Sequence, residues 1–133
     1  MNSGSIYTHI QNNIATIEFF HPASNSFPSE LLQRLTKEFD VLSLNSEVKV
    51  IVLKSEKEGA FCAGASFDEL MSITNFEEGK QFFLGFANVI NAMRKCSKLI
   101  IGRVQGKVVG GGVGLAAACD YCLATEQASI KLS

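Results

Sequence analysis

The chain has 133 residues, of which 47% are hydrophobic and 19% charged, a balance that argues against disorder and predicts one domain over residues 1–133. Its 12 basic and 13 acidic side chains give a net charge of −1, so we expect no nucleic acid and no membrane surface as a partner. The uncharged stretch 108–119 is broken by glycines and is too short to span a bilayer. The N-terminus lacks the pattern of a secretory signal, so we expect a cytoplasmic protein.

The cysteines do not predict a metal or redox site. Cys119 and Cys122 form a C-x-x-C motif, but a structural zinc site normally needs four ligands and the sequence holds no second such pair. A redox motif would begin a helix, where the thiol pKa is depressed, whereas this motif follows an alanine run that should end one. We expect Cys62, Cys96, Cys119 and Cys122 to be reduced thiols that pack as small apolar side chains.

In chain order, the first expected element is a β-hairpin. Residues 6–12 and 14–20 flank the turn signal Asn12-Asn13, and the second segment is rich in β-branched and aromatic side chains. Alternating strands of this kind pair most simply through a tight turn. We therefore expect two antiparallel strands at the start of the chain.

A helix and a buried strand are expected next. The helix should begin at Pro28, a residue that the first helical turn tolerates, and end near Asn45. It carries an apolar stripe at helical spacing, formed by Leu31, Leu32, Leu35, Phe39 and Leu42. Residues 48–53 are a run of mostly β-branched residues, which predicts a buried strand parallel to its neighbours.

Two further helices are expected in the middle of the chain. Residues 67–73 can form a short helix, and Asn75 with Glu78 resembles a capping box that begins a longer one. The longer helix should end at Arg94 and Lys95, whose charge the C-terminal helix dipole favours. We expect its apolar side in the core, formed by Phe82, Phe83, Phe86, Val89, Ile90 and Met93.

The remainder predicts a strand at 99–104, a turn at 105–107, a short helix at 113–119 and strands at 121–124 and 129–132. Strands and helices therefore alternate along the chain. This alternation is typical of the α/β class.

Two glycine-centred loops lead from a predicted strand into a predicted helix. Residues 61–67 read FCAGASF, and residues 110–114 read GGGVG. Small residues let a ligand approach the backbone, and N–H groups at a helix start have no partner within the helix. The second loop lacks the Rossmann and phosphate-loop patterns. Either loop alone can be a plain turn, but together their N–H groups can aim at one oxygen, as in an oxyanion hole.

In this order and spacing, the motifs resemble those of the crotonase (enoyl-CoA hydratase/isomerase) superfamily. The similarity rests on FCAGA at 61–65, FDEL at 67–70, QG at 105–106, GGG at 110–112 and ACD at 118–120, with Pro22 and Asn25 in an early loop. The resemblance implies a crotonase-like (ClpP/crotonase) spiral of ββα units that is incomplete at the C-terminus, the N-terminal half of a typical member. It also implies acyl-CoA thioester substrates, a homotrimer or hexamer when full length, and no cofactor, because coenzyme A is part of the substrate.

The resemblance also assigns site residues. The two N–H groups of the family's oxyanion hole map onto Ala65 and Gly111. The contacts to coenzyme A map onto Ala63, Gly64, Ala65, Ser66, Phe67, Gly110 and Asn25.

The sequence departs from the family pattern at three points. Many hydratases of the family carry a glutamate where this chain has Gly114, and their second acid would fall just beyond Ser133. A lysine that helps to hold the coenzyme A phosphate in some relatives is replaced by Asp68. The acid–base group is therefore expected outside this chain, and phosphate contacts must come from elsewhere.

Other polar residues have ordinary interpretations. Asp68 and Glu69 fit a solvated or dipole-stabilising role better than catalysis, and Asp120 fits hydrogen bonding to the backbone. His21 can contact a phosphate or ribose or lie at the surface, and Lys107 is expected in an exposed turn.

Three activities remain open on the sequence alone. The leading one is water addition to a 2-enoyl-CoA. Gly114 also fits a single-acid relative, such as a double-bond isomerase. The third is a non-catalytic acyl-CoA-binding module that kept the oxyanion hole and lost its acids.

Overall fold

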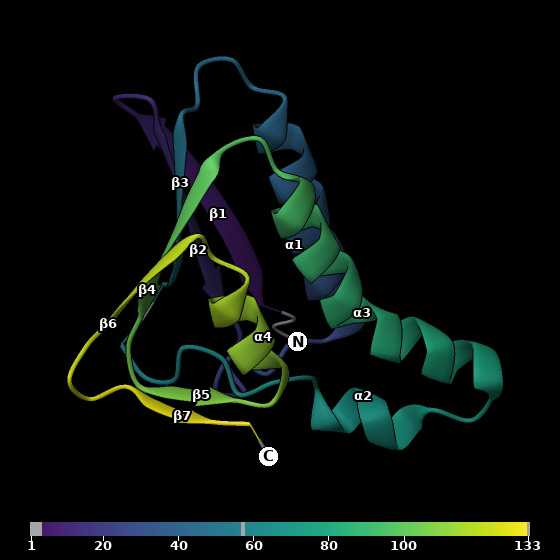
Figure 1. Cartoon of the computed structure of the whole chain (residues 1–133). Coiled ribbons are helices and arrows are strands. Elements are labelled where there is room, and N and C mark those ends of the chain that lie inside the picture. Colours follow the sequence, from purple (N-terminus) through teal and green to yellow (C-terminus); the bar gives the residue numbers. More distant parts are fainter. Residues whose placement is uncertain (1–3, 57, 133) are drawn as a thin grey trace.

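The computed structural model describes residues 4–56 and 58–132, which form a five-stranded sheet with helices on one face (Figure 1). The helices are α1 (Ser29–Ser43), α2 (Phe67–Ser72), α3 (Phe76–Lys95) and α4 (Gly111–Ala117). The strands are β1 (Ser5–Gln11), β2 (Ile14–Phe20), β3 (Val50–Ser55), β4 (Leu99–Val104), β5 (Lys107–Val109), β6 (Tyr121–Ala124) and β7 (Ser129–Lys131). The predicted α/β class is confirmed.

The predicted hairpin is confirmed. Strands β1 and β2 pair antiparallel, and the two turn residues Asn12 and Asn13 have φ values of 54° and 66°. Positive φ at both central positions is the geometry of a two-residue turn whose twist matches the strands. Asparagine tolerates this backbone region better than most residues, so the turn follows from the local sequence.

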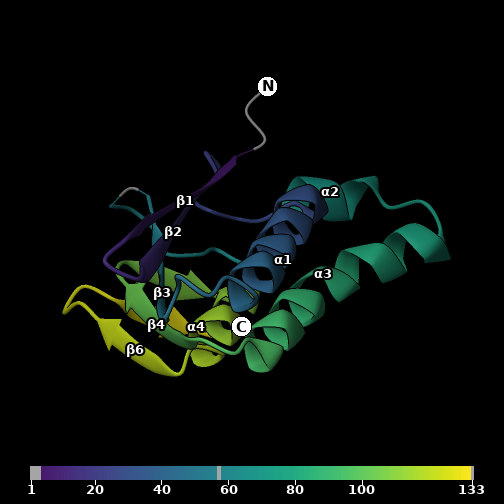
Figure 2. The ribbon, with the colours of Figure 1, turned by 90° about the horizontal axis from the view of Figure 1, so that it is seen from above.

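The large sheet runs in the order β1-β2-β3-β4-β6, and every pair after the hairpin is parallel. Along β3, Ile51 and Leu53 are fully buried while the intervening residues are half-buried. The buried side chains therefore face the helical layer, where α1, α3 and α4 cover the sheet (Figure 2). The predicted strand at 48–53 is confirmed with a shift of two residues.

Each turn of the chain repeats one pattern, which is a strand in the large sheet, then an extended segment in a smaller layer, then a helix. After β2, Phe27 forms a parallel bridge with Ala65. After β3, Cys62 bridges Val108 of β5, and β5 in turn pairs with β7. This is the spiral of ββα units that the resemblance implied.

Helix α1 buries the predicted stripe, because Leu31, Leu32, Leu35, Phe39 and Leu42 are all at most 2% exposed. Pro28 lies at the N-cap rather than inside the first turn, and it offers no side-chain acceptor. The carboxylate of Glu69, on α2, takes that role, since its Oε2 accepts hydrogen bonds from the Ser29 N–H at 3.0 Å and the Ser29 hydroxyl at 2.8 Å. A carboxylate at a helix N-terminus accepts a hydrogen bond from an otherwise unpaired N–H, and its negative charge interacts favourably with the helix dipole.

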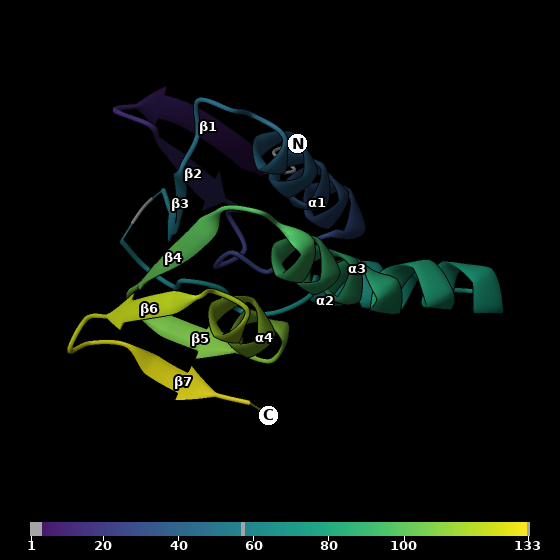
Figure 3. The ribbon, with the colours of Figure 1, turned by 45° about the horizontal axis from the view of Figure 1, so that its top comes forward.

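Helix α3 begins with the predicted cap and departs from prediction on its apolar side. The Asn75 side chain accepts from the Glu78 N–H at 2.8 Å, whereas the Glu78 carboxylate reaches Thr74 rather than Asn75. Phe82 is buried, but Phe83 is 71% exposed, so the expected core cluster is wrong at Phe83. The N-terminal half of α3 extends past the sheet, which leaves one side of it without covering elements (Figure 3).

Two boundaries near the C-terminus also differ from prediction. The segment expected as a turn after β4 continues into β5, a strand of three residues that pairs with β7. Helix α4 begins at Gly111 and ends at Ala117, two residues earlier at each end than the predicted 113–119. A strand this short has too few residues to show a periodic pattern, so pairing with a distant strand determines whether it forms.

We predict that Glu69→Ala lowers the free energy of unfolding by about 1–2 kcal/mol, because α1 loses the only side-chain acceptor described at its N-terminus. Urea denaturation followed by circular dichroism measures this change. Asp68→Ala is the matched control, since Asp68 is an exposed carboxylate of the same helix and should change stability by no more than about 0.5 kcal/mol. Equal effects of the two substitutions would contradict the capping role.

Candidate functional site

The candidate site is built around the extended segment 61–66, which backbone hydrogen bonds hold along both edges. On one edge, the Phe61 N–H donates to Lys107 O at 2.9 Å and the Val109 N–H donates to Cys62 O at 3.0 Å. On the other edge, the Phe27 N–H donates to Gly64 O at 2.7 Å. The Ser66 N–H returns a bond to Phe27 O at 2.9 Å. The segment is thus fixed between Phe27 and β5.

Among the described residues, the N–H groups of Ala65 and Gly111 have no protein acceptor, and neither do those of the adjacent Gly64 and Gly112. They lie close together. A Cβ built on Gly64 would stand 3.8 Å from Gly111 N and 3.3 Å from Val109 O. The φ of Gly64 is +94°, a conformation that glycine adopts without strain. The two loops that the sequence singled out therefore meet, and the residues assigned as oxyanion donors are neighbours.

The glycines of the second loop let α4 approach its neighbours closely. A Cβ on Gly111 would lie 2.8 Å from ring atoms of Phe86, and one on Gly112 would lie 2.5 Å from Cys62 O. Contacts this short do not occur for real Cβ atoms, so any side chain at these positions would push the helix start away. The N-terminus of α4 can therefore reach the first loop only because these positions are glycine.

Asn25 anchors the first loop to the early loop after β2. Its Oδ1 accepts from the His21 N–H at 2.6 Å, and its Nδ2 donates to Ala60 O at 2.9 Å and Phe61 O at 3.2 Å. The side chain is only 5% exposed and the backbone φ is +56°. Asn25 thus positions segment 61–66, a role that the sequence assignment as a coenzyme A contact did not include. A direct contact of Asn25 with coenzyme A stays a prediction.

The other assigned contacts lie on or beside the same loop. The Ala63 N–H donates to Asn25 O at 3.2 Å, and Ser66 caps α2 by accepting from the Glu69 N–H at 3.2 Å. Phe67 begins α2 and is 68% exposed. Gly110 is the N-cap residue of α4 and donates its N–H to Lys131 O at 3.2 Å. Residues 63–67, Gly110 and Gly111 are therefore brought to one region, and their roles toward coenzyme A stay predictions.

Two acidic residues that the sequence weighed as catalytic candidates take structural roles. Asp120 accepts from the Ile100 N–H at 2.7 Å, as the sequence suggested, and Glu69 caps α1. Position 114, where many relatives have glutamate, faces α3, and a Cβ on Gly114 would lie 3.0 Å from Ile90 Cδ1. Burial lowers the pKa of His21, and the negative charge of Asp68 partly opposes that shift.

The cysteines are free thiols, as expected, but they do not all pack inside. Burial raises the pKa of Cys62 to about 12, and Cys62 fills the gap between the first loop and α4. Cys122 is exposed on the edge strand β6, so the packing prediction is wrong there. Within residues 4–56 and 58–132, no three His, Cys, Asp or Glu side chains are arranged to hold a metal ion.

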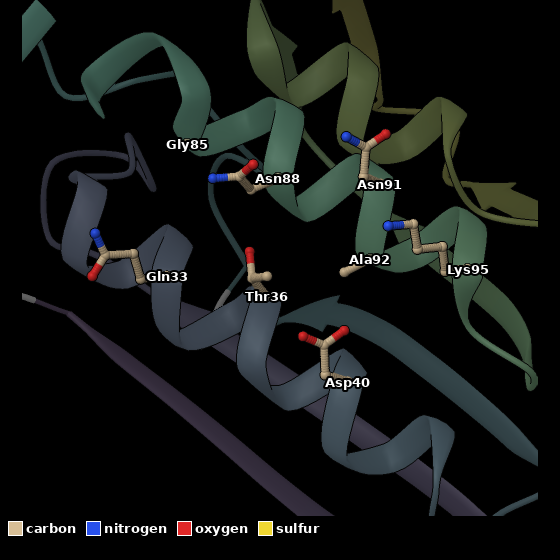
Figure 4. Close-up of a pocket in the computed structure, with 8 residues that line it drawn as sticks. All are labelled: Gln33, Thr36, Asp40, Gly85, Asn88, Asn91, Ala92 and Lys95. Atoms are coloured by element: carbon tan, nitrogen blue, oxygen red, sulfur yellow. The ribbon is translucent and has the colours of Figure 1, made fainter. Parts of the chain in front are cut away.

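A groove of about 320 Å³ lies elsewhere, between α1 and α3 (Figure 4). Its walls are mainly amide, hydroxyl and charged side chains, from Gln33, Thr36, Asp40, Gly85, Asn88, Asn91, Ala92 and Lys95. None of these residues belongs to either glycine loop, so the groove is separate from the candidate oxyanion site.

Sequence reasoning did not single out Phe27, and it assigned Phe86 to the apolar core of its helix. Phe27 pairs with the first loop through its backbone, and Phe86 contacts the second loop through its ring. In the sequence, Phe86 is one of several apolar residues of α3 with the same spacing, so no local signal distinguishes it from Phe82 or Phe83.

Comparison with known proteins assigns the fold to a family. The profile of the family described as enoyl-CoA hydratase/isomerase matches residues 9–133. The chain belongs to this family. The match covers both glycine loops and all elements from within β1 onward, so the crotonase resemblance of the motifs is confirmed.

Individual family members resemble this chain over part of their length. The human mitochondrial methylglutaconyl-CoA hydratase is 34% identical over 108 residues, which is 81% of this chain and 32% of that protein. An enoyl-CoA hydratase/carnithine racemase from Magnetospirillum magneticum superposes with a TM-score of 0.87 at 25% identity, covering 96% of this chain and 50% of that one. An enoyl-CoA hydratase from Mycobacterium smegmatis has the same score and identity, with 94% and 49% covered. The chain thus spans half or less of the length of these relatives.

The location in the cell stays a prediction. No helix among the described residues has the length and apolar character needed to cross a bilayer. Family relatives bear names of different compartments, since the human hydratase is called mitochondrial and another human relative, 29% identical over 126 residues, is called peroxisomal bifunctional enzyme.

We predict that Asn25→Ala lowers the free energy of unfolding by about 3 kcal/mol, because it leaves the His21 N–H and two loop carbonyls without partners. Urea denaturation measures the loss. Ser24→Ala is the control, since Ser24 has the same φ of 56° but an exposed side chain, and it should cost far less. A similar cost at both positions would assign the effect to the backbone conformation rather than to the Asn25 hydrogen bonds.

Proposed function

We propose that this family member acts on acyl-CoA thioesters and that its reaction is the addition of water to a 2-enoyl-CoA. The observation that carries the proposal is the pair of unpartnered N–H groups of Ala65 and Gly111, held side by side by the meeting of two loops. In this proposal they receive the thioester oxygen as an oxyanion hole.

The chemistry follows from where negative charge develops. Two N–H donors on the thioester oxygen draw electron density away from C3 of the enoyl group, which makes C3 open to attack by water. As the C–O bond forms, the attacking water gives up a proton to the carboxylate proposed below, and charge moves onto the thioester oxygen. The donors stabilise this enolate before C2 takes up a proton. Loss of one such donor typically costs about 10²–10³-fold in rate.

Backbone groups of the first loop are suited to hold coenzyme A. Among the described residues, the carbonyl oxygens of Ala63 and Ala65 accept no hydrogen bond, so they are free to accept from the adenine amino group and the pantetheine amides. Asp68 carries the wrong charge for the phosphates. We therefore assign recognition in this chain to the backbone of residues 63–67 with Gly110, and place the phosphate contacts elsewhere.

The proton-transferring carboxylate is proposed to lie outside residues 1–133. Position 114 has no side chain, and the acidic groups of Glu69 and Asp120 are occupied by backbone N–H groups. Gly114 also favours a second candidate, a double-bond isomerase that moves one proton with a single base.

We further propose that residues 1–133 are the N-terminal part of a crotonase-fold domain that assembles as a homotrimer or hexamer in the cytoplasm, and that coenzyme A enters only as part of the substrate. Exposed apolar side chains on the edge strands support further packing, since Tyr121, Leu123 and Ile130 are 61%, 54% and 58% exposed. Analytical ultracentrifugation of the full-length protein tests the assembly.

Titration with acetoacetyl-CoA tests the oxyanion hole directly, because a site that stabilises the enolate produces the enolate absorbance band. We expect the band with this chain, and far-UV circular dichroism on the same sample reports whether the chain is folded. A folded sample without the band would reject the assignment of Ala65 and Gly111. An unfolded sample moves the same test to the full-length protein.

The substrate distinguishes the two reactions. We expect the full-length protein to consume a 2-enoyl-CoA with loss of the conjugated thioester absorbance, and to leave a 3-enoyl-CoA unchanged. Conversion of the 3-enoyl-CoA into its 2-enoyl isomer would assign the protein to the isomerases. Binding of both with turnover of neither would instead indicate a non-catalytic acyl-CoA module.

A further inference from the structure

The ring of Phe86 lies against the start of α4, where the unpartnered N–H group of Gly111 is found. Phe86 comes from α3 and is half-buried. Three of its ring atoms lie 2.8–2.9 Å from the place that a Cβ on Gly111 would occupy. The ring therefore rests on the Gly111 backbone and fills the space that a side chain there would need.

The same ring also connects to the first loop. Phe86 stacks on Phe27 with ring centroids 6.2 Å apart and planes inclined by only 6°. The backbone of Phe27 accepts from the Ser66 N–H and donates to Gly64 O, so it holds the residues on both sides of Ala65. Phe27 is itself fully buried, with Phe19 edge-on to it at 5.1 Å.

We propose that Phe86 is a positioning residue that sets the separation between the Ala65 and Gly111 N–H groups. This inference rests on the proposed function of that pair as an oxyanion hole. The stack links the two donors, from the residues that flank Ala65 through the Phe27 backbone and ring to Phe86 and Gly111. Both donors must lie within about 2.7–3.1 Å of one oxygen, and a displacement of about 1 Å can cost about 10²-fold.

A smaller side chain at position 86 would allow the separation between the Ala65 and Gly111 N–H groups to change without removing either donor. Phe86→Leu keeps an apolar residue on α3 and leaves a gap beside Gly111, into which the start of α4 can move. The matched control is Phe82→Leu, which removes a buried ring from the same helix one turn earlier. Phe82 contacts Phe83 edge-on at 5.1 Å and lies outside the central core cluster.

The test separates binding from enolate stabilisation. For each variant, calorimetry gives the Kd of acetoacetyl-CoA and absorbance gives the enolate band per bound ligand. We expect Phe86→Leu to reduce the band per bound ligand by about tenfold or more while Kd changes by no more than about threefold. Phe82→Leu should leave both unchanged. An unaltered band in Phe86→Leu, or a parallel loss of band and binding in both variants, would overturn the positioning role.

Amide chemical shifts of the unliganded protein provide a second readout that does not depend on the proposed function. If the stack couples the two donors, Phe86→Leu should shift the Ala65 amide resonance as well as that of Gly111, whereas Phe82→Leu should move neither. A shift confined to Gly111 would reject the coupling. Absence of the band in the folded parent chain would reject the proposed oxyanion hole, and the amide shifts would then decide the coupling on their own.

Phe86→Leu combined with Gly111→Ala checks the contact itself and covers the case in which either variant folds poorly. Gly111→Ala alone forces a Cβ onto the ring and should lower stability in urea. With the ring replaced by leucine, the added methyl group has room, so the double variant should lose less stability than the two single losses combined. Strictly additive losses would show that ring and backbone do not restrain each other.

Discussion

Segment 61–66 is held along both edges by backbone hydrogen bonds, to Phe27 on one side and to β5 on the other. This double pairing is what joins three turns of the spiral, because Phe27, the segment and β5 belong to successive ββα units. The same pairing also determines which backbone groups of the loop remain free to bind a ligand. With Gly64 O and the Ser66 N–H engaged by Phe27, the peptide N–H of Ala65 between them points away from the pairing and has no acceptor among the described residues.

The second donor depends on how closely α4 can approach that segment. Glycine at positions 111 and 112 brings the helix start against Phe86 and the Cys62 backbone, at distances that no side chain would permit. Four elements therefore meet at the site: the Phe27 loop, segment 61–66, α3 and the start of α4. None of them supplies a charged group to the donors. The candidate site is a set of fixed backbone dipoles. In the proposed reaction such dipoles would stabilise developing charge, because they need no reorientation.

Much of the secondary structure could be predicted because its signals are local. The hairpin follows from two asparagines that accept positive φ, and α1 follows from a stripe of five leucine and phenylalanine side chains that all become buried. The predictions are wrong where contacts between distant parts of the chain determine the local structure. Strand β5 exists because β7 and Cys62 pair with it, and Phe83 is exposed because α3 runs past the sheet although its spacing matches that of a core residue.

The candidate site divides in the same way. The sequence by itself determined where small residues and helix starts occur. The order of these motifs was sufficient to indicate the family, because the positions of the glycines can be read directly from the sequence. Only the tertiary structure decided that the two loops touch and that the Asn25 side chain anchors the first loop through hydrogen bonds. It also decided that Phe86 rather than Phe83 lies against the glycines. The physical reason is that long-range pairing decides which backbone N–H groups are satisfied and which stay free, and the pairing partners come from segments far away in the sequence.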